Sequence, residues 1–168
     1  MKKLCLTIVV FVFLLFISNV IQAQNTQTKL NQVELMKQLI GTWKGEFDNK
    51  DSCVIAEIKS YGNGGIEIYQ KMLFKDEILS ESKTVMGYDT KNDKYIGATI
   101  NNKNPDILLR VAWFISENTY VLIPFEYISN PEQATSKAIY GFKSTDMFTA
   151  TFVNKNKPDK TYTWVRVK

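Results

Sequence analysis

The sequence predicts an all-β fold, a single antiparallel β-barrel of about 8–10 strands with a short N-terminal helix preceding the first strand. After residue 41 the chain reads as short strands separated by turn residues at regular intervals, with no second long helix and no linker. Several of these strands are apolar on both faces. Such a pattern is typical of a sandwich or a barrel, and of the two a closed barrel leaves no exposed edge strand.

Residues 1–23 have the three parts of a secretory signal peptide: a basic start, an apolar run over residues 6–17 and a cleavage position after Ala23. A transmembrane anchor is the alternative, but the run is shorter than the ~20 residues that a spanning helix needs. We therefore expect an exported protein, periplasmic or secreted, without a membrane anchor after cleavage. The mature chain then consists of a polar lead at residues 24–30 and a barrel domain at residues 31–168.

The composition narrows the classes of function. Lys and Arg number 21 and Asp and Glu 17, and removal of the two signal-peptide lysines lowers the net charge from +4 to +2. This balance, without a basic stripe, argues against nucleic-acid binding. Histidine is absent, which excludes histidine-based catalytic triads and the commonest zinc and haem ligand. We therefore expect no metal, no cofactor and no enzymatic activity.

Cys53 is alone in the mature chain, because Cys5 leaves with the signal peptide. An internal disulfide is therefore excluded. The neighbours Val54 and Ile55 favour a buried, inert thiol; a reactive thiol or an intermolecular bridge is the alternative.

Residues 31–40 predict the short helix. Val33, Met36 and Ile40 recur at helical spacing, Asn31 suits the N-cap, and Gly41 ends the element. The alternation of apolar residues and the turn residues between them predict ten strands, at residues 41–47, 52–60, 66–74, 78–88, 94–100, 107–115, 119–127, 136–142, 147–153 and 161–167.

Three features resemble the lipocalin-like, or calycin-like, secreted β-barrel domains. The short helix is followed by Gly41-x-Trp43, which matches the lipocalin G-x-W signature. The stretch GYDTKNDKYIG, residues 87–97, is similar to a Tyr-Asp hairpin of bacterial lipocalin-like domains of largely unassigned function and of the related nitrobindin-like barrels. Arg166 lies in the final strand, where lipocalins carry a basic residue that packs over the first-strand tryptophan. The resemblance covers residues 31–168.

The resemblance implies a barrel that is closed at one end by Trp43 and Arg166. In this interpretation Gly41 and Gly45 leave room for the Trp43 indole and for a neighbouring backbone. Two departures limit what is carried over. Nitrobindin-like barrels hold haem through a histidine, which this chain lacks, and most secreted lipocalins use disulfides, which the mature chain cannot form internally.

Arg110 is the sharpest candidate for ligand binding. It interrupts an apolar strand, between Leu108 and Ala112 on its own face. A buried guanidinium is costly unless it is paired, and its planar fork suits a carboxylate, so one interpretation is a ligand carboxylate inside the barrel. The alternative is a solvent-facing arginine whose stem covers apolar surface.

Gln70, Tyr140 and Phe114 complete the candidate set. One interpretation of Gln70 is a hydrogen-bonding group for a ligand in an apolar cavity. The alternative is a core amide whose hydrogen bonds are made within the protein. Tyr140 places a hydroxyl in or near a cavity or serves only as a good strand former. Phe114 shares a strand face with Arg110.

The preferred hypothesis is an exported barrel that binds a small apolar or amphipathic ligand in its interior. The alternative is a protein-interaction or inhibitor module with a filled barrel, acting through rim loops. Its lysines at 155, 157 and 160 are a solvated loop or a rim for an acidic partner. An enzyme on the same barrel would need convergent titratable groups in a cleft.

Overall fold

The computed structural model describes residues 29–47 and 51–167. The expected signal peptide and most of the expected polar lead therefore lie outside the described residues. Ten antiparallel strands close into a single barrel, with one short helical segment before the first strand. This confirms the predicted fold class, and the architecture is consistent with a lipocalin-like fold. Within the described ranges, no helix has the length and apolar character needed to cross a membrane.

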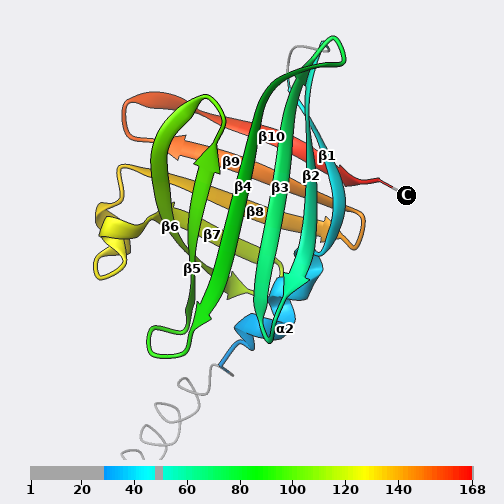
Figure 1. Cartoon of the computed structure of the whole chain (residues 1–168). Helices are drawn as coiled ribbons and strands as arrows, with labels where there is room; N and C mark the ends of the chain where they lie inside the picture. Colours follow the sequence, from blue (N-terminus) through cyan, green and yellow to red (C-terminus); the bar gives the residue numbers. More distant parts are fainter. Residues whose placement is uncertain (1–28, 48–50, 168) are drawn as a thin grey trace, which may run out of the picture.

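Each strand pairs with its neighbour in sequence, and the last returns to pair with the first. Strands β2–β6 stand upright in the front of Figure 1, and β7–β10 cross behind them. The strands are β1 (Gly41–Glu46), β2 (Ser52–Tyr61), β3 (Gly65–Phe74), β4 (Glu77–Asp89), β5 (Lys94–Asn101), β6 (Asn104–Ser116), β7 (Thr119–Pro124), β8 (Ser136–Ser144), β9 (Met147–Asn154) and β10 (Lys157–Arg166).

Three strands differ from the expectation by three residues or more at one end, and one of them is β6, which begins at Asn104 and not at residue 107. β7 ends at Pro124 and not at residue 127, because proline lacks the N–H that would continue a ladder, and the 3₁₀-helix η2 (Phe125–Tyr127) follows. β10 begins at Lys157, four residues earlier than expected. Its start pairs with Asn154, and an irregularity in the register between Lys157 and Lys160 accommodates the proline within that stretch.

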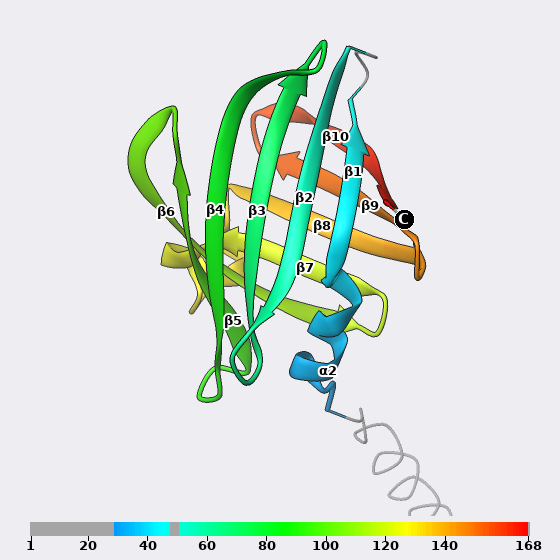
Figure 2. The ribbon, with the colours of Figure 1, turned by 45° about the vertical axis from the view of Figure 1, so that its right-hand side comes forward.

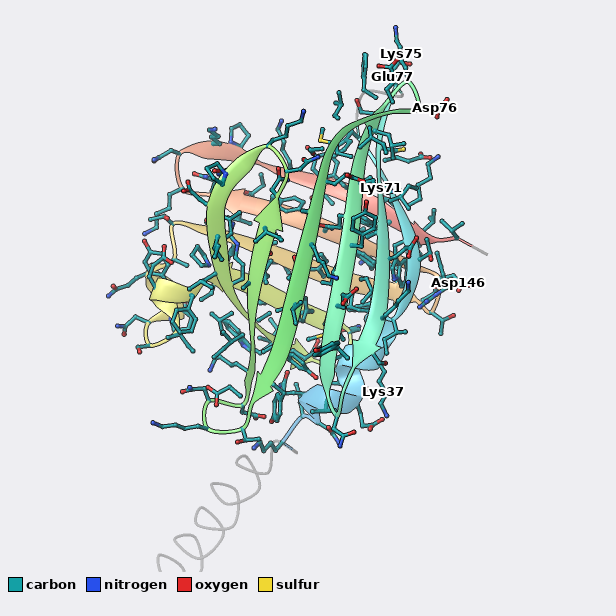
Figure 3. All side chains as sticks on the ribbon, in the orientation of Figure 1. Lys37, Lys71, Lys75, Asp76, Glu77 and Asp146 are labelled. Carbon is teal, nitrogen blue, oxygen red and sulfur yellow. The ribbon has the colours of Figure 1, made fainter. Side chains whose placement is uncertain are left out.

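A short helix closes one end of the barrel. α2 (Gln32–Met36) is capped by Asn31, whose side chain accepts a hydrogen bond from the Glu34 N–H, as expected, and it continues as the 3₁₀-helix η1 (Lys37–Leu39). Figure 3 shows Lys37 of this segment at the opposite end of the molecule from Lys75, Asp76 and Glu77, which form the tip of the β3–β4 hairpin.

Trp43 is fully buried at this closed end. Its indole N–H donates to the Leu39 carbonyl at 2.7 Å, and its ring meets Phe148 edge-on at 4.7 Å. The guanidinium carbon of Arg166 lies 4.2 Å from the Trp43 ring centroid. A Cβ added at Gly41 would overlap Arg166, and one added at Gly45 would overlap the indole of Trp164. The room that Gly45 provides is therefore used by Trp164, which packs across β1, and not by Trp43.

Candidate functional site

The barrel contains an interior cavity of about 280 Å³ above the closed end. Its aromatic wall comes from β7–β10 and consists of Tyr120, Tyr140, Phe148, Phe152 and Trp164. Its opposite wall comes from β2–β6 and combines aliphatic with polar side chains: Ala56, Ile58, Ile68, Gln70, Thr84, Met86, Thr99, Leu108 and Arg110. The alternation of side chains along each strand directs these residues inward. The result is a mainly apolar chamber with a few polar groups.

Most of the polar side chains in this cavity have a protein partner. The hydroxyls of Thr84 and Thr99 bond to each other at 2.7 Å. Gln70 accepts a long hydrogen bond, 3.4 Å, from the Ser82 hydroxyl, so its amide has capacity for a further partner. The indole N–H of Trp164 is buried and has no hydrogen-bond partner among the described residues.

Arg110 is the one cation among the residues that line this cavity. It occupies the middle of β6, opposite Gly97 of β5 and Pro124 of β7. In the described part of the chain its guanidinium has neither a hydrogen bond nor an ion pair, and no Asp or Glu lines the cavity. Arg110 is half-buried, and an unpaired guanidinium beside apolar walls is stabilised by an anion placed next to it.

Tyr140 lies close enough to Arg110 for the two groups to interact electrostatically. Burial raises the pKa of Tyr140 to about 12, and the positive charge of Arg110 opposes part of that increase. Tyr140 is therefore a neutral hydroxyl at physiological pH and is available as a hydrogen-bond donor beside the cation.

The structure brings together three of the four candidate residues. Gln70, Arg110 and Tyr140 line the interior cavity. Phe114 does not: it is 1% exposed and packs at the closed end against Tyr120 and Phe142, with ring centroids 5.1 and 6.0 Å away. It supports the floor below the cavity.

Two further cavities adjoin the interior one. The first, called the top cavity, has about 220 Å³, shares Gln70, Phe152 and Trp164 with the interior cavity and extends past Ser80 to Glu46. The second, called the side cavity, has about 240 Å³. It is lined by Arg110, Leu122, Ile123, Pro124, Ser136, Lys137, Ala138, Phe152, Val153 and Asn154.

Sequence reasoning did not select the aromatic residues Phe152 and Trp164 or the Thr84–Thr99 pair as site residues. No local signal marks them, because threonine and aromatic residues are common in any strand. Within residues 29–47 and 51–167, no group of three or more Cys, Asp or Glu side chains is placed to hold a metal ion. Cys53 is a half-buried free thiol on β2.

Comparison with known proteins adds no assignment to this geometry. No protein-family model matches the chain, and no curated protein sequence is significantly similar to it.

Proposed function

We propose that this protein binds a small amphipathic molecule with an anionic group inside its barrel. The observation that carries the proposal is Arg110, an unpaired guanidinium on the wall of a mainly apolar cavity whose lining includes no acid. An anionic ligand would supply the missing partner, and charge-assisted hydrogen bonds to a planar guanidinium are among the strongest in proteins.

The remaining groups suit such a ligand. The Tyr140 hydroxyl can donate to the same anionic head, and the Gln70 amide can bond a second polar atom. The aliphatic and aromatic walls would cover an apolar body. The cavity volume of about 280 Å³ favours a small ligand, since ligand pockets commonly begin at about 300 Å³.

The proposed role is binding and not catalysis. Of the polar side chains on the cavity wall, none titrates near neutral pH in its ordinary state, so no general acid or base is offered. The proposal also includes export, on the basis of the signal-like residues 1–23. N-terminal sequencing of the protein recovered from the periplasm or medium, with Gln24 as the expected first residue, tests that part separately.

The test of binding uses two dyes of similar shape, the anionic 1-anilinonaphthalene-8-sulfonate and the neutral N-phenyl-1-naphthylamine. Both fluoresce in apolar surroundings. We expect Arg110→Met to weaken binding of the sulfonate dye about 10–100-fold, which corresponds to loss of charged hydrogen bonds, and to leave the neutral dye within about twofold. Lys155→Met, which removes a charge from the exposed β9–β10 turn, is the matched control.

Equal affinity of wild type and Arg110→Met for the sulfonate dye would contradict the anionic-head assignment. Failure of the wild type to bind either dye, together with native mass spectra that show no retained small molecule, would favour the alternative of a protein-interaction module acting through rim loops.

A further inference from the structure

We infer that the anionic ligand enters the barrel through its side wall, at the side cavity between β6 and β8, and not through the top cavity. This inference rests on the proposed function, because it concerns the route to the same cavity.

The wall of the barrel is incomplete above Pro124. β6 has 13 residues and β7 has 6, and the first ladder pair between them joins Arg110 to Pro124. Of the six residues Asn104–Leu109, Asn104, Leu108 and Leu109 pair with β5, and none of the six pairs with a described strand on the other edge. Figure 2 shows this part of the β5–β6 hairpin leaning away from β8 and β9.

The side cavity lies at this gap, and both exposed residues and residues of the interior cavity line it. On the outer side it is lined by Lys137 and Asn154, which are exposed. On the inner side it shares Arg110, Leu122 and Phe152 with the interior cavity. A molecule in the side cavity therefore already contacts the cation to which its head would bind.

The two openings differ in charge. The side cavity is lined by two cations, Arg110 and Lys137, and by no acid, and neither cation has an ion pair within the described residues. The top cavity is lined by Glu46 and by no cation, and Glu46 is paired with Lys44 at 3.1 Å. Unpaired charges of one sign attract an oppositely charged ligand and raise its association rate.

The rim of the gap is also apolar where β6 stands free. Ile107 and Leu109 are 63% and 48% exposed, and Leu108, on the opposite face, lines the interior cavity. These side chains offer an apolar surface to the body of an amphipathic ligand while its head meets the cations. The side opening therefore offers cations to the anionic head of the proposed ligand and an apolar surface to its body. The top opening has no unpaired cation.

The test compares two serine-to-tryptophan variants. Ser136 lines only the side cavity and Ser80 only the top cavity, and both are half-buried. Stopped-flow mixing with 1-anilinonaphthalene-8-sulfonate measures association and dissociation rates. We expect Ser136→Trp to slow both rates about tenfold and to leave Kd within about twofold, because a blocked route changes rates and not the equilibrium. Ser80→Trp should leave both rates unchanged.

A second measurement does not depend on tolerance of a bulky side chain. Lys137→Glu should lower the association rate about threefold or more and reduce its dependence on salt, as expected for loss of steering. Lys155→Glu makes the same change of charge on the β9–β10 turn and should have a smaller effect.

Unchanged rates in both Ser136→Trp and Lys137→Glu would overturn the side route, as would slowing by Ser80→Trp equal to or greater than that by Ser136→Trp. In either case dye binding by the wild type would leave the proposed function standing. Absence of dye binding by the wild type would instead remove the proposed function, and the route with it.

Discussion

The side-chain amide of Gln32 forms two hydrogen bonds with the backbone of Phe114. Its nitrogen donates to the Phe114 carbonyl at 3.0 Å, and its oxygen accepts from the Phe114 N–H at 2.7 Å. The pair joins α2 to β6 across 82 residues of sequence, and Gln32 is 5% exposed. The helix is thus attached to the barrel by a buried polar clamp as well as by its apolar face.

Replacement of Gln32 should destabilise the protein strongly. Gln32→Ala leaves both backbone groups of Phe114 buried without their partner, and each such group costs about 1–3 kcal/mol. We expect a loss of about 2–4 kcal/mol in the free energy of unfolding, measured by urea denaturation. Gln38→Ala, which removes an exposed bond to the Glu117 carbonyl, is the matched control and should cost less than about 1 kcal/mol. Equal losses in the two variants would contradict the clamp.

The two arginines of the chain should separate stability from binding. The guanidinium of Arg166 lies over Trp43 and donates hydrogen bonds to the carbonyls of Ile40, Gln38 and Thr145. Arg166→Lys removes the planar guanidinium and most of these bonds, and should lower the free energy of unfolding by about 1–3 kcal/mol. Arg110→Met removes an unpaired cation and should change stability by less than about 0.5 kcal/mol. Thermal and urea unfolding of the two variants, beside dye binding, checks this contrast. A large stability loss in Arg110→Met would show a structural role for that residue.

The fold was predictable because its signals are local. Turn residues and alternation of period two mark each strand, and Asn31 marks the helix start. The bounds that were missed depend on pairing. Residues 125–127 read as part of a strand until the pairing with β6 shows that the ladder stops at Pro124, and the residues before 161 read as a loop until their pairing with β9 is known.

The candidate site was predictable only in part, because alternation reveals which face a residue occupies but not how deep in the barrel it lies. Arg110 was found because a charge in an apolar strand is conspicuous. Phe114 lies on the same face of β6 as Arg110 but four residues further along the strand. At the rise of a strand this is about 13 Å, which places Phe114 at the closed end. The sequence marks Gln32 only as a polar residue of the helix, because its hydrogen-bond partner is the backbone of Phe114, far away in the sequence.

Gly45 should tolerate no side chain. A Cβ there would lie 2.7 Å from Cε2 of the Trp164 indole, so Gly45→Ala forces this buried ring to shift and should cost about 1–3 kcal/mol. Gly87→Ala is the matched control in a strand with no atom within 4 Å of the added Cβ. It should be neutral or stabilising by about 0.5–1 kcal/mol, since glycine weakens strands. Urea midpoints that fall equally in both variants would contradict this interpretation.

Stability should fall at alkaline pH through the buried tyrosines, and Tyr140 should account for part of the loss. Its pKa is about 12 in the folded protein against 10.0 for the free side chain. Below pH 10 the hydroxyl is neutral in both states, and its contribution is fully present. Between pH 10 and 12 the unfolded chain loses the proton first, so the free energy of unfolding decreases, by at most about 1.4 kcal/mol per pH unit for this group.

Tyr140→Phe should therefore flatten the decline of stability across pH 10–12, measured by urea unfolding at each pH. Tyr61→Phe, at an exposed position, is the control and should leave the slope unchanged. Arg110→Met should move the tyrosinate absorbance titration of Tyr140 to higher pH, because the positive charge of Arg110 lowers that pKa. The assignment to Tyr140 follows from the difference between Arg110→Met alone and Arg110→Met combined with Tyr140→Phe. An unshifted titration would mean that the guanidinium does not act on this hydroxyl, and the two could not then hold one anionic head together.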